Sequence, residues 1–190
     1  NGADEMKFYT STLERMRIDS SGTIISTING TTSTANKHIK LGGGTSTNGN
    51  GQYIQFSSSS NASLGSRIEG TREGAGGSSN LKIYTTNTAG SVIERMRVDS
   101  SGRVGIGVTP YVWDTSFNNI QIGNKISLWS ASNNGGLSYN QYYNGTNNIY
   151  QTNDTANRFQ MDSDGFHFYQ AASGTAGNTA TFFESMRIDS

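Results

Sequence analysis

Apolar and polar residues alternate over short stretches of this chain, and each stretch ends at a turn signal. In the segment 94–99, Met96 and Val98 fall on one side of an extended strand. Arg95 and Arg97 fall on the other side, so one face of the strand is apolar and the other is charged. There is no sustained helical period of about 3.6 residues, and we expect the chain to be all-β.

A turn of defined chemistry follows this strand. Asp99 opens the sequence Asp-Ser-Ser-Gly, and an aspartate at the first position of a type I turn accepts backbone hydrogen bonds. Gly102 supplies the left-handed conformation of the residue that follows such a turn. Val104 and Ile106 suit a returning strand, so the segment 94–106 is predicted to be a β-hairpin.

Two other segments carry hairpin signals. The segment 161–166 contains the same turn chemistry in a diverged form, Asp-Ser-Asp-Gly. Residues 143–146 contain an Asn-Gly pair, which is typical of tight hairpins. Because turn signals recur along the whole chain, we expect short strands joined by hairpins throughout.

The strand and its turn are repeated. The segment 14–22, Glu-Arg-Met-Arg-Ile-Asp-Ser-Ser-Gly, returns with one change as 94–102 and in part as 184–190. Such self-similarity is the sequence signature of a duplicated structural unit. The positions that we assign to this structural motif are Met16, Ile18, Asp19, Gly22, Met96, Val98, Asp99, Gly102, Met186, Ile188 and Asp189.

The repeats also predict the organisation of the chain. We assign 1–22 to the end of a preceding repeat, 23–102 to a first repeat and 103–190 to a second repeat. Runs rich in glycine and serine lie inside the repeats and are interpreted as surface loops. The third motif copy stops where the first two continue into Ser-Gly, and we expect the chain to be an internal segment of a longer one.

The composition points away from an independent globular core. Leu, Ile, Val and Phe together number 34 of 190 residues, a level at which a chain struggles to bury a core alone. The net charge of zero and the 10% of aromatic residues do not fit a disordered chain either. Regularly spaced apolar positions can be buried against copies of the same chain, so we expect an obligate oligomer.

The charge balance limits the partners. Lys and Arg number 14, as do Asp and Glu, so no net field attracts nucleic acid or an anionic membrane. No apolar run approaches the roughly 18 residues of a membrane-spanning helix. Neither a nucleic-acid partner nor membrane insertion is predicted.

Candidate catalytic and metal-binding chemistry is sparse. The glycine-rich segment 102–107 lacks the Lys-Ser/Thr pair of a phosphate-binding loop. The segment 162–165 resembles the start of a calcium loop, but its glycine comes too early and Ser173 stands at the last ligand position. His38 and His167 have no ligand partners at metal spacing, and the carboxylates outside the motif form no convincing catalytic pair. We predict no catalytic, cofactor-binding or metal-binding residue.

One region combines aromatic and amide side chains. Between residues 129 and 150, tyrosines and a tryptophan are mixed with asparagines, a combination that suits contact with a sugar. The same aromatic residues also suit packing on a strand face, which is the interpretation we favour. The candidate glycan contacts are Trp129, Tyr139, Tyr142 and Tyr143.

The motif resembles a known repeat. Met-Arg-Val-Asp-Ser-Ser-Gly followed by Val-Gly-Ile-Gly and Thr-Pro, within 96–110, is similar to repeats of bacteriophage tail fibres and tailspikes. In that family such repeats often precede a self-cleaving intramolecular chaperone of the endosialidase type. The resemblance implies an elongated, repeat-built homotrimeric fibre of short strands and hairpins, located in the virion and extracellular. Its implied partners are copies of itself, other tail or fibre proteins and a host-surface glycan, and it implies no cofactor.

The expected function is therefore structural and adhesive. A rigid trimeric rod would present a receptor-binding tip or contribute to host attachment, without enzymatic activity. Two alternatives stay open: a polysaccharide-degrading tailspike segment, and a bacterial extracellular or surface fibre built from phage-like repeats.

Overall fold

The structure is a computed structural model that describes residues 5–18, 20, 24–26, 47–57 and 64–189. Within these residues the chain is all-β, as predicted, apart from a short 3₁₀ turn at Ala75–Gly77. The chain forms two compact units, Asn1–Gly42 and Gly43–Ser190.

The first unit contains a three-stranded antiparallel sheet in the order β1-β2-β3. β2 carries the first motif copy, and its Met16 pairs with Phe8 of β1 and with Ser26 of β3. Asp19 and Gly22, the turn residues of this copy, lie outside the described residues. The bounds are β1 (Met6–Thr10), β2 (Leu13–Ile18) and β3 (Ile24–Ser26).

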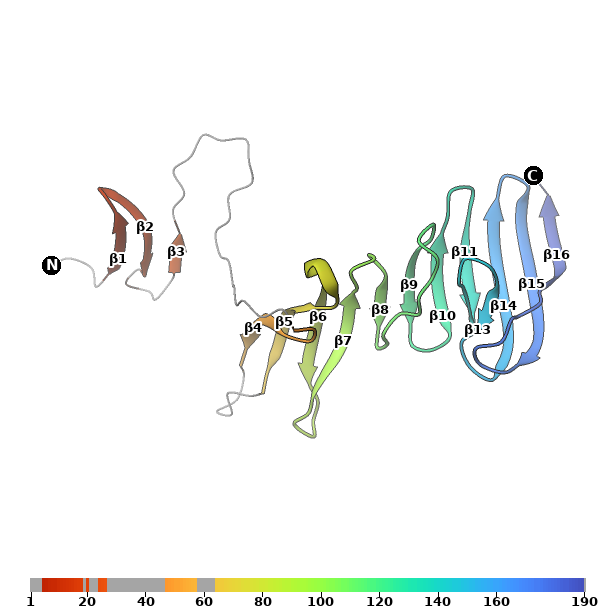
Figure 1. Ribbon diagram of the computed structural model, residues 1–190, viewed down its shortest axis with the longest axis horizontal. Helices are drawn as coiled ribbons and strands as arrows, with labels where there is room; N and C mark the ends of the chain where they lie inside the picture. Colours follow the sequence, from red (N-terminus) through yellow and green to blue (C-terminus); the bar gives the residue numbers. More distant parts are fainter. Residues whose placement is uncertain (1–4, 19, 21–23, 27–46, 58–63, 190) are drawn as a thin grey trace. The chain divides into compact units, whose positions relative to one another are not determined.

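The second unit is built on one sheet of eleven strands (Figure 1). The order is β16-β15-β14-β11-β10-β9-β8-β7-β6-β5-β4, so strands that are close in the sequence are also close in the sheet. Neighbouring strands are antiparallel except β8 and β9, which are parallel. The bounds are β4 (Gly51–Phe56), β5 (Ser66–Arg72), β6 (Ser79–Thr86), β7 (Val92–Val98), β8 (Val104–Ile106), β9 (Asn118–Ile122), β10 (Ile126–Ser130), β11 (Asn134–Tyr139), β14 (Asp154–Asp162), β15 (Gly165–Gly174) and β16 (Phe183–Asp189).

The predicted hairpin of the second motif copy is confirmed. β7 pairs with β8, and Gly102 has a φ of 80° in the turn between them. The Asp99 carboxylate accepts hydrogen bonds from the backbone N–H groups of Ser101 and Arg103, at 2.9 and 3.0 Å. Asp99 also forms an ion pair with the Arg103 guanidinium at 2.6 Å. The turn is therefore held by the aspartate and glycine chemistry expected of its sequence.

The two other predicted hairpins are also present. β14 and β15 are joined by a tight turn in which Gly165 has a φ of 128°. The third hairpin forms a separate two-stranded sheet of β12 (Gln141–Tyr143) and β13 (Asn148–Tyr150). Its loop, residues 144–147, is longer than the expected tight turn, and Asn144 Oδ1 accepts hydrogen bonds from two N–H groups within it.

A β-bulge interrupts the strict alternation that the sequence predicted. Between Met96 and Glu94, β7 advances by two residues while its partner β6 advances by one. Glu94 therefore lies on the same face as Arg97, and the two form an ion pair at 2.6 Å. Arg95, expected on that charged face, is the extra residue, and its Nε donates to Thr85 Oγ1 at 2.8 Å. The bulge recurs in all three motif copies, at Arg15, Arg95 and Ser185.

A second layer covers one face of the later strands. The connection 107–117 leads from β8 to the parallel strand β9, and its Trp113 is only 2% exposed. The β12–β13 hairpin belongs to the same layer, because the Asp114 N–H donates to the Tyr143 carbonyl at 2.9 Å. The Trp113 ring stacks on that of Trp129 in β10, with centroids 6.4 Å apart.

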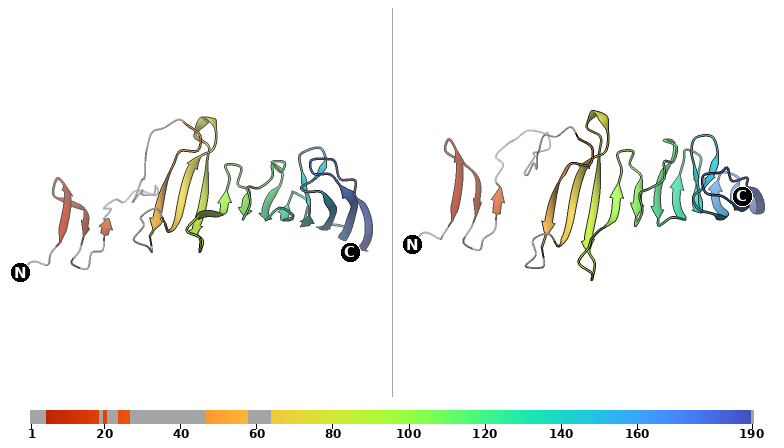
Figure 2. Two further views of the ribbon diagram at one scale, coloured as in Figure 1. Left: turned by 90° about the horizontal axis from the view of Figure 1, so that it is seen from below. Right: turned by 60° about the horizontal axis from the view of Figure 1, so that its bottom comes forward.

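Figure 2 shows in two further views that the strands from β4 to β10 follow one another in a single sheet.

A buried apolar cluster fastens this second layer to β14 and β15. It consists of Tyr150, Ala156, Ala171 and Ala180, with Phe182 packed against it. β14 contributes Ala156, β15 contributes Ala171, and the connection from β15 to β16 contributes Ala180, while β13 contributes the large tyrosine ring. The covered face of the sheet therefore has a modest core of its own.

Candidate functional site

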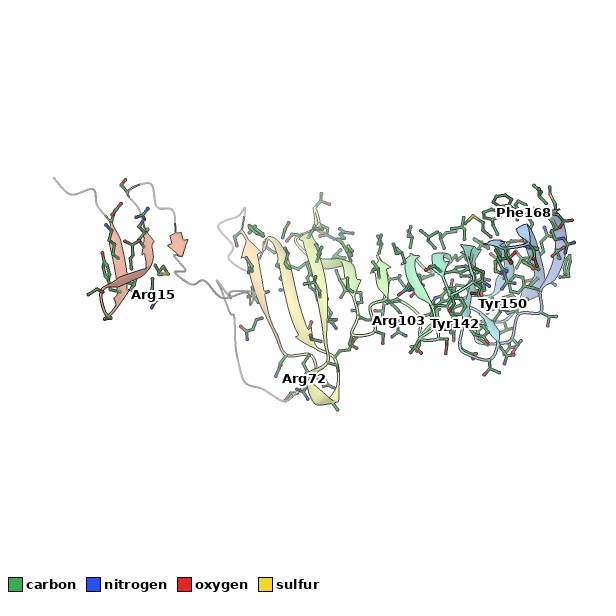
Figure 3. The ribbon with its side chains drawn as sticks, turned by 90° about the horizontal axis from the view of Figure 1, so that it is seen from above. Arg15, Arg72, Arg103, Tyr142, Tyr150 and Phe168 are labelled. Atoms are coloured by element: carbon green, nitrogen blue, oxygen red, sulfur yellow. The ribbon has the colours of Figure 1, made fainter. Side chains whose placement is uncertain are left out.

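The face opposite the second layer is apolar and open to solvent. Nine neighbouring strands, from β6 to β16, each contribute one apolar residue to an unbroken cross-strand row. The exposed fraction is 53% at Leu128, 46% at Leu137 and 37% at Phe168. Figure 3 shows Phe168 on the opposite side of the sheet from Tyr142 and Tyr150 of the second layer. The row consists of Leu81, Val98, Val104, Ile120, Leu128, Leu137, Phe159, Phe168 and Met186.

A second apolar row runs beside the first. On each strand that contributes to both rows, the two apolar residues are two positions apart, as Met96 and Val98 are. Both rows therefore lie on the same face of the sheet. Soluble monomers rarely expose a contiguous apolar surface of this extent, which is typical of an interaction surface. The second row consists of Ile54, Ile68, Ile83, Met96, Ile106, Ile122 and Ile126.

Most of the described apolar motif residues belong to this face. Met96 and Val98 are half-buried members of the two rows, and Met186 is 53% exposed at the end of the first row. Ile188 pairs with Phe166 on the same face. The other described motif residues are Met16 and Ile18, half-buried in β2, Asp99 and Gly102 in the β7–β8 turn, and Asp189, exposed in β16.

The apolar face is hollowed at Gly135. This glycine pairs with Ser130 and with Met161, so a side chain is missing from the surface between them. The hollow has a volume of about 510 Å³, and its walls include Val104, Ile120, Leu128 and Met161. A hollow with apolar walls suits a protruding apolar group of another surface.

The covered face carries a buried histidine between two carboxylates. His167 is 5% exposed. Its Nδ1 lies 3.0 Å from Glu184 Oε2 in the edge strand β16, and its Nε2 lies 3.1 Å from Asp162 Oδ1. The hydrogen bond with Glu184 contributes most to raising the pKa of His167, and burial opposes it. The histidine thus ties the edge strand to the β14–β15 turn.

A small cavity lies between the sheet and the second layer. Its volume is about 130 Å³, and it is lined by four aromatic residues, four residues with amide side chains and one arginine, Arg158. The aromatic residues are Trp113, Phe117, Trp129 and Tyr143. Several buried polar atoms of the walls have no hydrogen-bond partner: Trp113 Nε1, Asn134 Oδ1, Gln141 Oε1 and Arg158 Nε. Because buried polar groups are almost always bonded, these walls suit a polar guest.

The structure brings together two of the four candidate glycan contacts. Trp129 and Tyr143 line the cavity. Tyr139 lies elsewhere and hydrogen-bonds Lys125 and Asp154, at 3.0 and 2.9 Å. Tyr142 is also outside the cavity walls, and its ring stacks on that of Tyr111 with centroids 4.9 Å apart.

Sequence reasoning missed other residues of the cavity. Three of these residues come from separate elements of the chain. Trp113 lies in the connection 107–117, Gln141 in the β12–β13 hairpin and Arg158 in β14. One available signal was Trp113, a large aromatic residue between the predicted return strand 104–106 and the aromatic region 129–150. Arg158 gave no signal, because an arginine in a strand normally faces solvent.

The fold and these surfaces define a class of protein in broad terms. It is an all-β chain whose long sheet has one face partly covered by a polar second layer and one bare apolar face. No family model and no curated protein matches the chain. Across the residues given above as described, no group of three or more possible metal ligands occurs, and no helix is long and apolar enough to cross a membrane.

Proposed function

We propose that this chain is a structural segment of a homotrimeric fibre of the tail-fibre type. Three copies bury their apolar faces against one another around a common axis and leave their covered, polar faces to solvent. The observation that carries this proposal is the unbroken apolar row across nine strands. The role is mechanical: a rod that spaces and presents host-attachment surfaces.

The free energy available from this face is large enough for assembly. Complete burial of a Val, Leu, Ile or Phe side chain stabilises by about 1.5–3 kcal/mol, so covering a half-exposed side chain contributes on the order of 1 kcal/mol. Two rows of such residues offer on the order of 10 kcal/mol per chain, which is comparable with the entropic cost of association.

The shape of the sheet favours a rod over a compact particle. The strands are added one after another in sequence order, so each further repeat lengthens the sheet instead of closing it. The stoichiometry of three rests on the resemblance of the motif, whereas the burial of the apolar face rests on its exposure in the single chain.

Sedimentation equilibrium of the 190-residue chain tests this proposal. We expect a trimer, and a Leu128→Asp, Leu137→Asp double variant should sediment as a folded monomer because both positions lie in the apolar row. A matched Asn144→Asp, Thr146→Asp variant changes the exposed β12–β13 loop and should stay trimeric. A stable wild-type monomer contradicts self-association, and a dimer contradicts the trimer.

A further inference from the structure

The two repeats provide a comparison within one molecule. Lys82 of β6 pairs with Arg97, and His167 of β15 pairs with Arg187, at equivalent motif positions. This equivalence aligns β5 with β14. In both repeats an arginine then lies opposite a tyrosine, Arg67 opposite Tyr84 and Arg158 opposite Tyr169.

Both arginines lie over these tyrosine rings. The guanidinium carbon of Arg67 is 4.3 Å from the Tyr84 centroid, and that of Arg158 is 4.5 Å from the Tyr169 centroid. They differ in their carboxylate partner. Arg67 forms an ion pair with Glu69 at 2.9 Å, and the residue equivalent to Glu69 in the second repeat is Gln160.

Arg158 is therefore left without an anion. In the described part of the chain no carboxylate lies within ion-pair distance of it. Its guanidinium carbon lies over the rings of Tyr169 and Phe182, at 4.5 and 5.1 Å, and its Nε, like that of Arg67, makes no hydrogen bond. The Gln160 amide donates instead to Asp162 Oδ2 at 2.8 Å. Burial lowers the pKa of Arg158 below its ordinary value, because the charged form is less well solvated inside the protein than in water. Arg158 is half-buried, and a cation held partly away from water normally has a partner.

Arg158, which lacks a carboxylate partner, lies at the cavity between the sheet and the second layer. Arg158 and Gln160 both line it, beside the unbonded Trp113 Nε1 and Gln141 Oε1. Trp113 and Gln141 are 2% and 1% exposed, so these groups are built into the interior and do not belong to a mobile surface. The cavity is roughly ten times larger than the space that one water needs.

We propose that this cavity binds a small hydroxylated organic carboxylate, of the sugar-acid class. The carboxylate takes the place of Glu69 of the first repeat and compensates Arg158. Hydroxyl groups both donate and accept, so they satisfy Gln141 Oε1 and Trp113 Nε1 together. The ring of the ligand packs on the aromatic walls. The site lies on the face opposite the apolar rows, so its occupancy is independent of the proposed assembly.

Titration calorimetry and amide chemical shifts test the site, with D-glucuronate as probe and D-glucose as its neutral match at equal ionic strength. We expect one glucuronate per chain, bound at least tenfold more tightly than glucose. Acetate, which lacks the ring and hydroxyls, should also bind at least tenfold more weakly. Equal binding of glucose overturns the role of the charge, and equal binding of acetate overturns the role of the hydroxylated ring.

Two variants locate the interaction. Gln160→Glu gives the second repeat the ion pair of the first, and it should weaken glucuronate binding at least tenfold. Arg158→Gln should remove the preference for glucuronate over glucose. Glu69→Gln, the matched change in the first repeat, should leave glucuronate binding unchanged. The thermal melt of each variant reports its folding.

Three results contradict the proposal. They are the failure of glucuronate to bind the folded wild-type chain, unchanged binding by folded Gln160→Glu, and loss of binding in folded Glu69→Gln. If Arg158→Gln does not fold, Gln160→Glu still decides the question, because it keeps the arginine and supplies an internal carboxylate.

Discussion

At the scale of single residues, His167 shows how a motif position acquires a new role. The residue opposite the second motif arginine is a lysine in the first two copies, Lys7 and Lys82. In the third copy it is His167, which is held between Glu184 and Asp162. A histidine titrates near neutral pH, so this copy responds to pH in a range where the lysines do not.

The first prediction concerns the pH dependence of stability. The folded-state pKa of His167 is raised above its ordinary value of 6.5, mainly by the Glu184 hydrogen bond. Its contribution to stability is therefore complete below the unfolded-state pKa and is lost as pH rises through the folded-state pKa. Between pH 6 and pH 9 the melting temperature of the wild type should fall more than that of a His167→Gln variant. Parallel pH profiles of the two proteins contradict the assignment.

The second prediction concerns Gly102, whose φ of 80° suits glycine. No atom outside its immediate chain neighbours lies within 4 Å of a Cβ at this position, so any cost of substitution comes from the backbone and not from a clash. Gly102→Val should destabilise by about 1–3 kcal/mol, because a β-branched residue resists positive φ. Gly102→Asn should cost less, since asparagine tolerates this conformation. Chemical denaturation measures both, and equal costs would argue against a backbone origin.

At the scale of secondary-structure elements, the bulge in the motif strand explains its charge pattern. It brings a glutamate and an arginine three residues apart onto one face in every copy, at Glu14 and Arg17, Glu94 and Arg97, and Glu184 and Arg187. The separations are 3.6, 2.6 and 4.0 Å respectively. Moving the glutamate off the apolar face is what allows the rows beside the motif to stay free of charge.

The third prediction compares a residue of the apolar face of β7 with the exposed bulge residue of the same strand. Met96 lies in an apolar row between Ile83 and Ile106, and in the proposed trimer it would become buried. Met96→Asp then places a carboxylate of each copy in a dry interface, at several kcal/mol per ion. The trimer should be lost. Arg95→Ala on the same strand removes one hydrogen bond, to Thr85, and should cost about 1 kcal/mol. Heat-resistant oligomer bands on a gel compare the two, and a stable trimer of Met96→Asp rules out burial of this face.

At the scale of the whole molecule, stability should depend on association. The Gly43–Ser190 unit has few fully buried apolar side chains, and many large ones are exposed. In the proposed trimer, most of the hydrophobic free energy would therefore be gained only when copies meet.

The fourth prediction follows from that dependence. The melting temperature should rise with protein concentration, because association stabilises only the folded chain. Sodium sulfate, which strengthens apolar burial, should raise it further. Differential scanning calorimetry over a hundredfold range of concentration checks both effects. A concentration-independent transition would show that the single chain is stable by itself.

The sequence by itself determined the local structure of this protein. Turn chemistry at Asp99 and Gly102 and the alternation around Met96 and Val98 are local properties, since each depends on neighbours within a few residues. They predicted the strands, the hairpins and the apolar face of β7. The bulge at Arg95 was not predictable, because it depends on how β7 advances against β6.

Only the tertiary structure decided which surfaces exist. The apolar rows require the register of every neighbouring pair, including the parallel β8–β9 pair, and no local pattern encodes that register. The cavity needs Trp113, Gln141 and Arg158 to meet from three separate elements. Arg158 gave no signal in the sequence, yet it is half-buried beside the rings of Tyr169 and Phe182. The reason is physical: burial, unpaired charge and cavity walls arise from contacts between segments far apart in the chain.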